Sequence, residues 1–116
     1  MDGWREHEAR RRAGIRERNE WTEEANVHLG SHAPTDPPAE ADDYACECGC
    51  PGCQEKVGLT IPEYEAVRAE GAQFVVAVNH EDPEIEAVAT KNDRFVVVRV
   101  LVRSLARIAR ERDPRS

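Results

Sequence analysis

Four cysteines fall within eight residues, at positions 46, 48, 50 and 53, in a segment that we call the cysteine loop (residues 44–53, YACECGCPGC). Thiolates are strong ligands for Zn²⁺, which prefers four of them, or thiolates with imidazole, in a tetrahedron. Two disulfides in so short a loop would be strained and would cross-link no distant parts of the chain. The N-terminal sequence is too charged for a secretory signal, so we expect a cytoplasmic protein, whose cysteines serve metal or redox chemistry. The loop therefore predicts a metal site.

The size and composition of the chain give this site a structural purpose. The chain has 116 residues, of which 40% are apolar and only 5% aromatic. A domain of this size buries only about 60–65% of its unfolded surface. A bound metal would add folding energy that such a small core lacks. No apolar run approaches the roughly 20 residues of a membrane span, so we expect no membrane association.

Two ligand sets are compatible with the cysteine loop. In the first, Cys46, Cys48 and Cys53 bind Zn²⁺ together with His80, and Cys50 stays free. In the second, all four cysteines bind. We favour the first because a histidine that follows a distant apolar run would tie the fold together, whereas the second packs four thiolates into eight residues. The other histidines lie in or beside charged segments and are poor candidates: His7, His28 and His32. The fourth ligand thus stays open between Cys50 and His80.

Periodicity and capping signals predict a small zinc-stabilised α+β domain over residues 44–112. Thr60 and Glu63 form a capping-box pattern, and Pro62 suits a first helical turn. The apolar runs are rich in β-branched residues and favour buried strands. We expect strands at 56–59, 73–78 and 94–100, and helices at 60–70, 84–89 and 101–112. The strands would form a short two- to three-stranded sheet with the helices packed on it.

Less compact segments are expected at both ends. Residues 1–29 predict a charged helix, over about 4–28, because Arg, Glu and Ala dominate. Its apolar positions form no 3.6-residue stripe, so we expect a solvated, mobile arm; the alternative is a docking helix anchored by Trp4 or Trp21. Residues 30–43, with three prolines, predict a linker. Residues 113–116 predict a disordered tail.

Charge is distributed unevenly along the chain. Residues 25–90 carry two basic side chains against thirteen acidic ones, and residues 91–116 carry eight against three. Arg103, Arg107 and Arg110 recur at helical spacing in the last predicted helix, opposite an apolar face. We expect this helix to pack on the sheet and expose its arginines. The alternatives are that the arginines contact an acidic partner, an acidic patch of the same chain, or nucleic-acid phosphates, the last of which the acidic body opposes.

The sequence gives little indication of catalysis. A catalytic zinc keeps an open coordination position, which three thiolates and a histidine do not leave. No Gly-rich phosphate loop or Gly-x-Ser-x-Gly motif is present, and no His-x-Glu box precedes the cysteines. The C-x-x-C at 50–53 lacks the helix that follows in redox motifs. We therefore expect a non-catalytic interaction or regulatory module with an unidentified protein partner and no small-molecule substrate. Nucleic-acid binding and thiol-based redox or metal sensing are the alternatives.

A series of short motifs runs from the cysteine loop to the last predicted strand. Its residues are Cys46, Cys48, Cys53, Leu59, Thr60, Glu63, Tyr64, Glu65, Val67, Arg68, Phe74, Val76, His80, Pro83, Glu84, Phe95 and Val97. This pattern over residues 44–98 resembles a family of small, uncharacterised actinobacterial-type proteins with the motifs Cys-x-Cys-x4-Cys, LT-x-x-EYE-x-VR and Gly-His. The resemblance implies that three cysteines and the histidine bind the metal. Cys50 departs from the pattern, as does Asn79 in place of glycine, although Asn tolerates a left-handed backbone.

Overall fold

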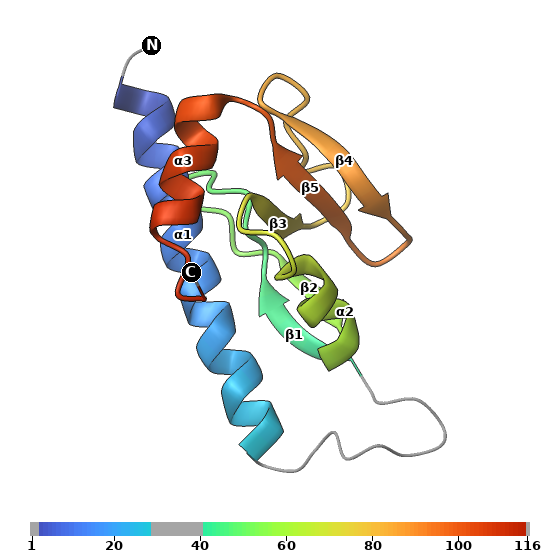
Figure 1. Cartoon of the computed structure of the whole chain (residues 1–116). Helices are drawn as coiled ribbons and strands as arrows, with labels where there is room; N and C mark the ends of the chain where they lie inside the picture. Colours follow the sequence, from blue (N-terminus) through green and yellow to red (C-terminus); the bar gives the residue numbers. More distant parts are fainter. Residues whose placement is uncertain (1–2, 29–40, 116) are drawn as a thin grey trace.

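Three helices and two small antiparallel sheets make up the described part of the chain, residues 3–28 and 41–115 of a computed structural model. In chain order the elements are α1 (Gly3–His28), β1 (Asp42–Ala45), β2 (Lys56–Leu59), α2 (Ile61–Val67), β3 (Gln73–Val76), β4 (Glu86–Lys91), β5 (Val96–Val100) and α3 (Arg103–Glu111). The long α1 runs along one side of the molecule, with α3 beside its N-terminal half and the sheets next to both (Figure 1). The predicted α+β class is confirmed.

The strands form two separate sheets rather than one. β1 pairs with β2, and β5 lies between β3 and β4 in a three-stranded sheet. The strand predicted at 56–59 is confirmed as β2, but it joins a hairpin and not the sheet of the two apolar strands. Its partner β1 was missed because it is short and begins with two acidic residues, and it straddles the boundary between the predicted linker and the cysteine loop. The rest of that predicted linker, up to residue 40, lies outside the described residues.

The helix predicted at 84–89 is wrong. These residues enter β4, which pairs with β5 through Val88 opposite Val98, with an irregularity between Val88 and Thr90. Only Glu86 of this strand is buried, and Val88 is 48% exposed. The sequence pattern of residues 84–89 therefore did not distinguish a helix from a strand. Pairing with the edge of β5 determines the strand conformation of β4. Such tertiary pairing routinely overrides weak local propensity.

Helix α2 begins as its capping box predicts. The Glu63 N–H donates to the Thr60 hydroxyl at 3.3 Å, and the Thr60 N–H donates to the Glu63 carboxylate at 2.9 Å. The helix ends at Val67, earlier than expected, and the side chain of the next residue, Arg68, is buried and pairs with Glu20 and Asp113. This pairing joins α2 to α1 and to the C-terminal segment.

Helix α3 confirms the predicted amphipathic basic helix. It buries Leu105, Ala106 and Ala109, while its arginines are exposed. Leu101, which the predicted apolar face included, precedes the helix and is 63% exposed. The helix packs across α1 and the three-stranded sheet, so its apolar side closes that end of the core.

The core lies between the two sheets and the helices. The apolar strands supply most of it, as their sequence predicts, and Tyr44 stacks on Tyr64 with ring centroids 4.6 Å apart. The largest fully buried apolar side chains are Tyr44, Tyr64, Phe74, Leu59, Val57, Val67, Val75, Val76, Val96 and Val98. Burial of this kind stabilises a domain by about 25 cal/mol per Å² of apolar surface.

The expectation that α1 is a solvated arm is wrong. One face of α1 is buried against β1, α3 and the cysteine loop, but this face is mostly polar, which hid it from a search for apolar periodicity. Its buried residues are Glu8, Ala9, Arg12, Ala13, Arg16, Asn19 and Glu23. Trp21 points away and is 65% exposed. The helix is therefore part of the folded body.

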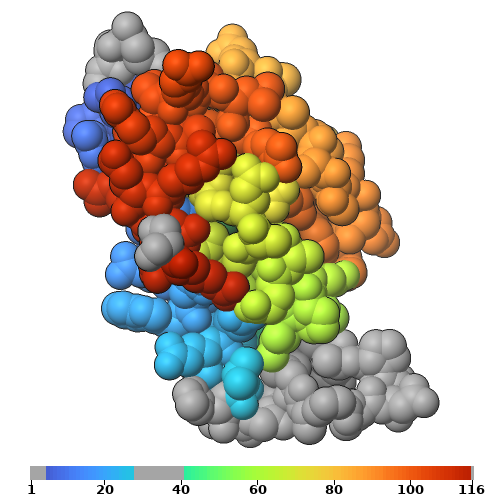
Figure 2. Space-filling view, viewed as in Figure 1, coloured from blue at the N-terminus to red at the C-terminus, as the bar shows by residue number. Residues whose placement is uncertain are grey.

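The C-terminal residues also differ from the disordered tail expected at 113–116. Asp113 pairs with Arg68, and Arg115 pairs with Glu20, Glu23 and Glu65. The end of the chain consequently lies against both α1 and α2 (Figure 2). Ser116 is outside the described residues.

None of the helices in the described ranges combines the length and the apolar character that a membrane-spanning helix requires.

Candidate metal centre

Four predicted ligands come together at one end of the two-stranded sheet. Cys46, Cys48, Cys53 and His80 each offer one donor atom, and these four atoms lie within 4.8 Å of one another. The sulfurs of Cys46 and Cys53 lie 3.5 and 3.6 Å from Nδ1 of His80. A tetrahedral zinc with bonds of about 2.3 Å to sulfur and 2.0–2.1 Å to nitrogen places such pairs about 3.6 Å apart. The four side chains are therefore positioned to bind a metal ion.

Backbone geometry explains how the ligands reach one another. His80 follows β3 in a turn in which Asn79 has φ 73°, the left-handed conformation expected for an asparagine in place of glycine. Gly49 has φ 77°, and a Cβ there would lie 2.5 Å from Cγ of Arg12 and 3.0 Å from the Glu8 carbonyl oxygen. Glycine is thus required at position 49, because the cysteine loop lies directly against α1.

Backbone N–H groups support two of the sulfurs. The Ala77 N–H donates to the sulfur of Cys46 at 3.2 Å, and the Cys50 N–H donates to that of Cys48 at 3.5 Å. Hydrogen bonds of this kind favour the thiolate form that binds metals. They also link Cys46 to the chain just before His80, so two ligands from distant segments are held in one arrangement.

The thiols interact electrostatically with one another. A hydrogen bond between Cys46 and Cys48 raises the pKa of the Cys46 thiol, as does its burial, and lowers the pKa of the Cys48 thiol. Partial desolvation of the Cys50 sulfur, together with the neighbouring Cys48, raises the pKa of Cys50 to about 11. Thiolates this close would repel one another if all were ionised, and a divalent cation removes that repulsion. The donor set therefore fits a soft divalent metal ion.

Glu47, between two of the ligands, is fully buried and joins the cysteine loop to β3. Its N–H donates to the Val75 carbonyl at 2.8 Å, and its carboxylate accepts from the Val75 N–H at 3.0 Å. The carboxylate also accepts from the Asn19 side-chain amide at 2.8 Å, and its carbonyl accepts from Arg12 Nε at 2.7 Å. Burial raises the pKa of this carboxyl group. Because β3 leads to His80, the hydrogen bonds of Glu47 to β3 fix the position of the cysteine loop relative to the His80 imidazole.

Helix α1 holds the rest of the cysteine loop. Arg11 donates to the Gly49 carbonyl at 2.5 Å. The Asn19 side chain donates to the Ala45 carbonyl at 2.9 Å and accepts from the Ala45 N–H at 3.0 Å, as a neighbouring strand would. The contacts of Arg11 and Asn19 with the loop were not predicted from the sequence, because charged and polar residues along a helix are typical of a face exposed to solvent. Glu47, the acidic residue between two predicted metal ligands, was the sequence feature that could have indicated these contacts.

The structure brings together the first of the two predicted ligand sets. Cys50 is exposed and lies outside the four-donor cluster. His7 is exposed on α1, the side chain of His28 is not described, and His32 lies outside the described residues.

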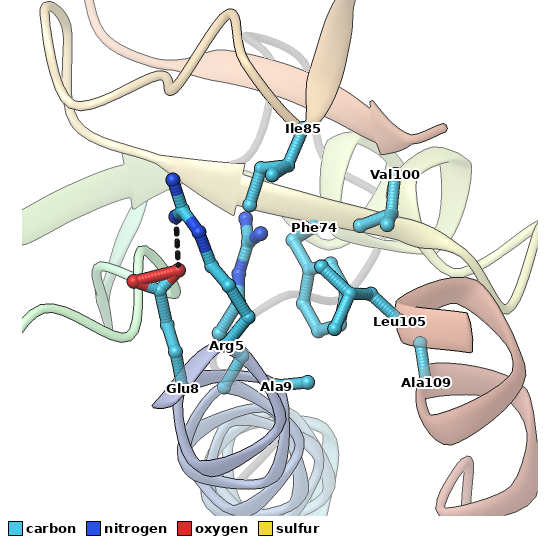
Figure 3. A pocket seen from close by; sticks show the side chains of 9 residues that line it. Arg5, Glu8, Ala9, Phe74, Ile85, Val100, Leu105 and Ala109 are labelled. Carbon is cyan, nitrogen blue, oxygen red and sulfur yellow. Dashed lines mark hydrogen bonds and ion pairs between the residues drawn. The ribbon is translucent and has the colours of Figure 1, made fainter. Parts of the chain in front are cut away.

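Two hollows lie near this region. A groove of about 610 Å³ runs between α1 and β1 and reaches Cys46 and Cys53. A much smaller cavity, of about 10 Å³, lies between α1, β3 and α3, walled by Phe74 and Leu105 with the Arg5–Glu8 ion pair at one side (Figure 3). The smaller one has room for about one water molecule, so it is a packing gap rather than a ligand site.

No family model, no curated protein and no solved structure matches the chain. The functional interpretation therefore rests on the geometry of its own residues.

Proposed function

We propose that the chain is a zinc protein whose Cys46, Cys48, Cys53 and His80 hold one structural Zn²⁺. The sulfur-to-nitrogen separations of 3.5 and 3.6 Å carry this proposal, because they match a tetrahedral zinc. Three thiolates with one imidazole are a common structural zinc set, whereas iron–sulfur clusters usually take four cysteines at other spacings.

This zinc has a structural role and not a catalytic one. Four protein donors fill a tetrahedron and leave no position for a reactive water. The ligands come from the end of β1, the turn before β2 and the turn after β3, so one ion joins three segments. Since the site does not exist in the unfolded chain, its binding energy becomes folding energy.

The zinc-held domain acts as a cytoplasmic protein-interaction or regulatory module. Support comes from Trp21, which is 65% exposed on α1 while the opposite face of that helix is buried. Tryptophan is enriched among the residues that dominate binding energy at interfaces. Membership of the actinobacterial-type family whose motifs the chain resembles is part of this proposal.

Metal content under native conditions tests the zinc site. Native mass spectrometry of the reduced protein should show one zinc per chain. Cys50→Ser should keep the zinc and His80→Ala should lose it, and a chelator should lower the unfolding midpoint. Loss of zinc from Cys50→Ser but not from His80→Ala would establish the four-cysteine set instead. A metal-free folded monomer with unchanged melting would refute the site.

The interaction role requires its own experiment. The zinc-loaded chain, crosslinked in the cell that makes it, should capture a protein that the Trp21→Ala variant fails to capture. Equal capture by both variants would remove Trp21 as the anchor.

A further inference from the structure

Cys50 and Cys53 occupy the first and last positions of one reverse turn. The Cys53 N–H donates to the Cys50 carbonyl at 3.2 Å, and Gly52 has φ 78° after Pro51, the pattern of a type II turn. Such a turn brings its end Cα atoms within about 7 Å, and a disulfide needs about 4.4–6.8 Å. The backbone is therefore already shaped for a bond between these two sulfurs.

The same two cysteines are the accessible ones. Cys50 is exposed and Cys53 is half-buried, whereas Cys46 and Cys48 are buried. The groove between α1 and β1 is lined by both Cys46 and Cys53, and of these two only Cys53 is partly exposed, so a small polar oxidant can reach the Cys53 sulfur. Oxidation of cysteine follows thiolate character and exposure. Among the proposed zinc ligands from the cysteine loop, Cys53 is thus the one an oxidant meets first.

We propose that Cys50 and Cys53 form a reversible redox site that controls the metal centre. Two-electron oxidation by a peroxide joins the spare thiol to one ligand, removes that ligand from the site and releases the ion. This inference rests on the proposed zinc site, and it gives Cys50 a role that metal binding leaves unassigned.

The chemistry balances with peroxide as the only co-reactant. The Cys53 thiolate attacks one peroxide oxygen, the O–O bond breaks, and Cys53 becomes a sulfenic acid while hydroxide leaves and takes a proton from a buffer acid to give the first water. The Cys50 sulfur then attacks the Cys53 sulfur, and the thiol proton leaves with the displaced oxygen as a second water. Two sulfurs together lose two electrons, and hydrogen peroxide becomes two waters.

The remaining ligands keep their positions, which makes the step reversible. Cys46 and Cys48 flank Glu47, whose hydrogen bonds to Val75 and Asn19 do not involve Cys50 or Cys53. Oxidation would therefore leave two sulfurs and the imidazole close together, with too few donors for a closed tetrahedron. Reduction of the disulfide returns the fourth donor to a site that is still assembled.

The test compares the zinc-loaded full chain with its Cys50→Ser variant, which retains all four proposed ligands. After equimolar hydrogen peroxide, a chromophoric chelator should detect one zinc released per wild-type chain, with loss of two thiols. Peptide mapping should find a Cys50–Cys53 disulfide, and dithiothreitol with added zinc should restore the starting state. The variant should release zinc at least about ten-fold more slowly, because the cysteines that remain beside its Cys53 sulfenic acid, Cys46 and Cys48, are held by the ion as ligands and the spare thiol is gone.

Several outcomes would overturn the inference. Release from Cys50→Ser at the wild-type rate would show that Cys50 takes no part, and a mapped Cys46–Cys48 or Cys48–Cys50 bond would refute the assigned pair. Zinc that stays bound, with no disulfide formed, would refute the inference and leave the zinc site intact. If the reduced protein contains no zinc, the proposed function fails, and mapping the peroxide-treated chain still decides whether the Cys50–Cys53 bond forms.

Discussion

The two longest helices, α1 and α3, are both rich in arginine but use it in opposite ways. Helix α1 buries Arg12 and Arg16 beneath the body of the protein, whereas α3 exposes Arg103 and Arg107 and buries Leu105 and small alanines instead. The difference shows that helix composition does not decide which face is buried. What decides it is whether the partner surface supplies acceptors for the buried guanidinium groups.

The surface under α1 supplies those acceptors. The guanidinium groups of Arg12 and Arg16 lie 4.4 and 4.5 Å from the centroid of the Phe74 ring. Arg16 also donates to the carbonyls of Gly71 and Ala109 at 2.7 and 2.5 Å. Arginine suits such sites because its planar head stacks on aromatic rings and donates in several directions. Helix α1 is therefore held by polar contacts, many of which end at the cysteine loop.

Removal of Arg12 is expected to give the largest effect. Arg12 donates to Glu86 at 2.7 Å, and both side chains are almost completely buried. Arg12→Ala would leave the Glu86 carboxylate buried without its cation, and we expect a loss of about 3–5 kcal/mol in the free energy of unfolding. Urea denaturation of the zinc-saturated protein measures this loss. The double variant Arg12→Ala, Glu86→Ala should be less destabilised than the sum of the single variants; additive losses would contradict a coupled buried pair.

Replacement of Asn19 should affect both stability and metal affinity. Asn19→Ala removes the hydrogen bonds to Ala45 and to the Glu47 carboxylate, for which we expect about 1–3 kcal/mol of lost stability. Because Glu47 positions the loop, zinc affinity should fall about 10–100-fold, as for other groups that orient metal ligands. Competition with a chromophoric chelator measures the affinity. The matched control is Arg18→Ala, an exposed neighbour on the same helix, and an equal loss from that control would mean that Asn19 has no special part.

Local signals made about half of this arrangement predictable. The capping box fixed the start of α2, and β-branched runs predicted β3 and β5, because these features depend on neighbours in sequence. The cysteine spacing likewise predicted a metal site, but it left the fourth ligand open between Cys50 and His80. Helix α1 and β4 were misjudged because their conformation depends on long-range partners. The buried residues of α1 recur at helical spacing, but most of them are polar. A polar side chain such as Arg16 can be buried only where the surface against which it packs offers hydrogen-bond acceptors.

A smaller effect is expected from pH through Glu23, on the buried face of α1. Burial, with the neighbouring carboxylate of Glu65, raises the pKa of Glu23 to about 8, against the opposing influence of Arg115. Between the ordinary glutamate pKa of about 4.3 and this raised pKa, the folded state binds a proton that the unfolded state has lost. Stability from this group is therefore complete at low pH and is lost as pH rises toward 8.

Glu23→Gln should remove that pH dependence. Denaturant midpoints of the zinc-saturated wild type should fall from pH 5.5 through pH 8 relative to those of the variant, and the two should run parallel above about pH 9. Glu65 does not disturb this window, because Arg115 lowers its pKa to about 2 and its contribution changes only in more acidic solution. Parallel curves from pH 5.5 upward would mean that the Glu23 carboxyl is ionised throughout.

The smallest effect is expected from the exposed arginines of α3. Arg107→Ala should change the free energy of unfolding by no more than about 0.5 kcal/mol, as for other surface substitutions. A loss of more than about 1 kcal/mol would show that α3 uses its arginines as α1 does. The same variant tests nucleic-acid binding, because any salt-sensitive binding of a random duplex through α3 should weaken when one phosphate contact is removed. Since Arg99 and Arg110 already pair with Glu70, part of the positive charge in this region is neutralised, and we expect no binding to alter.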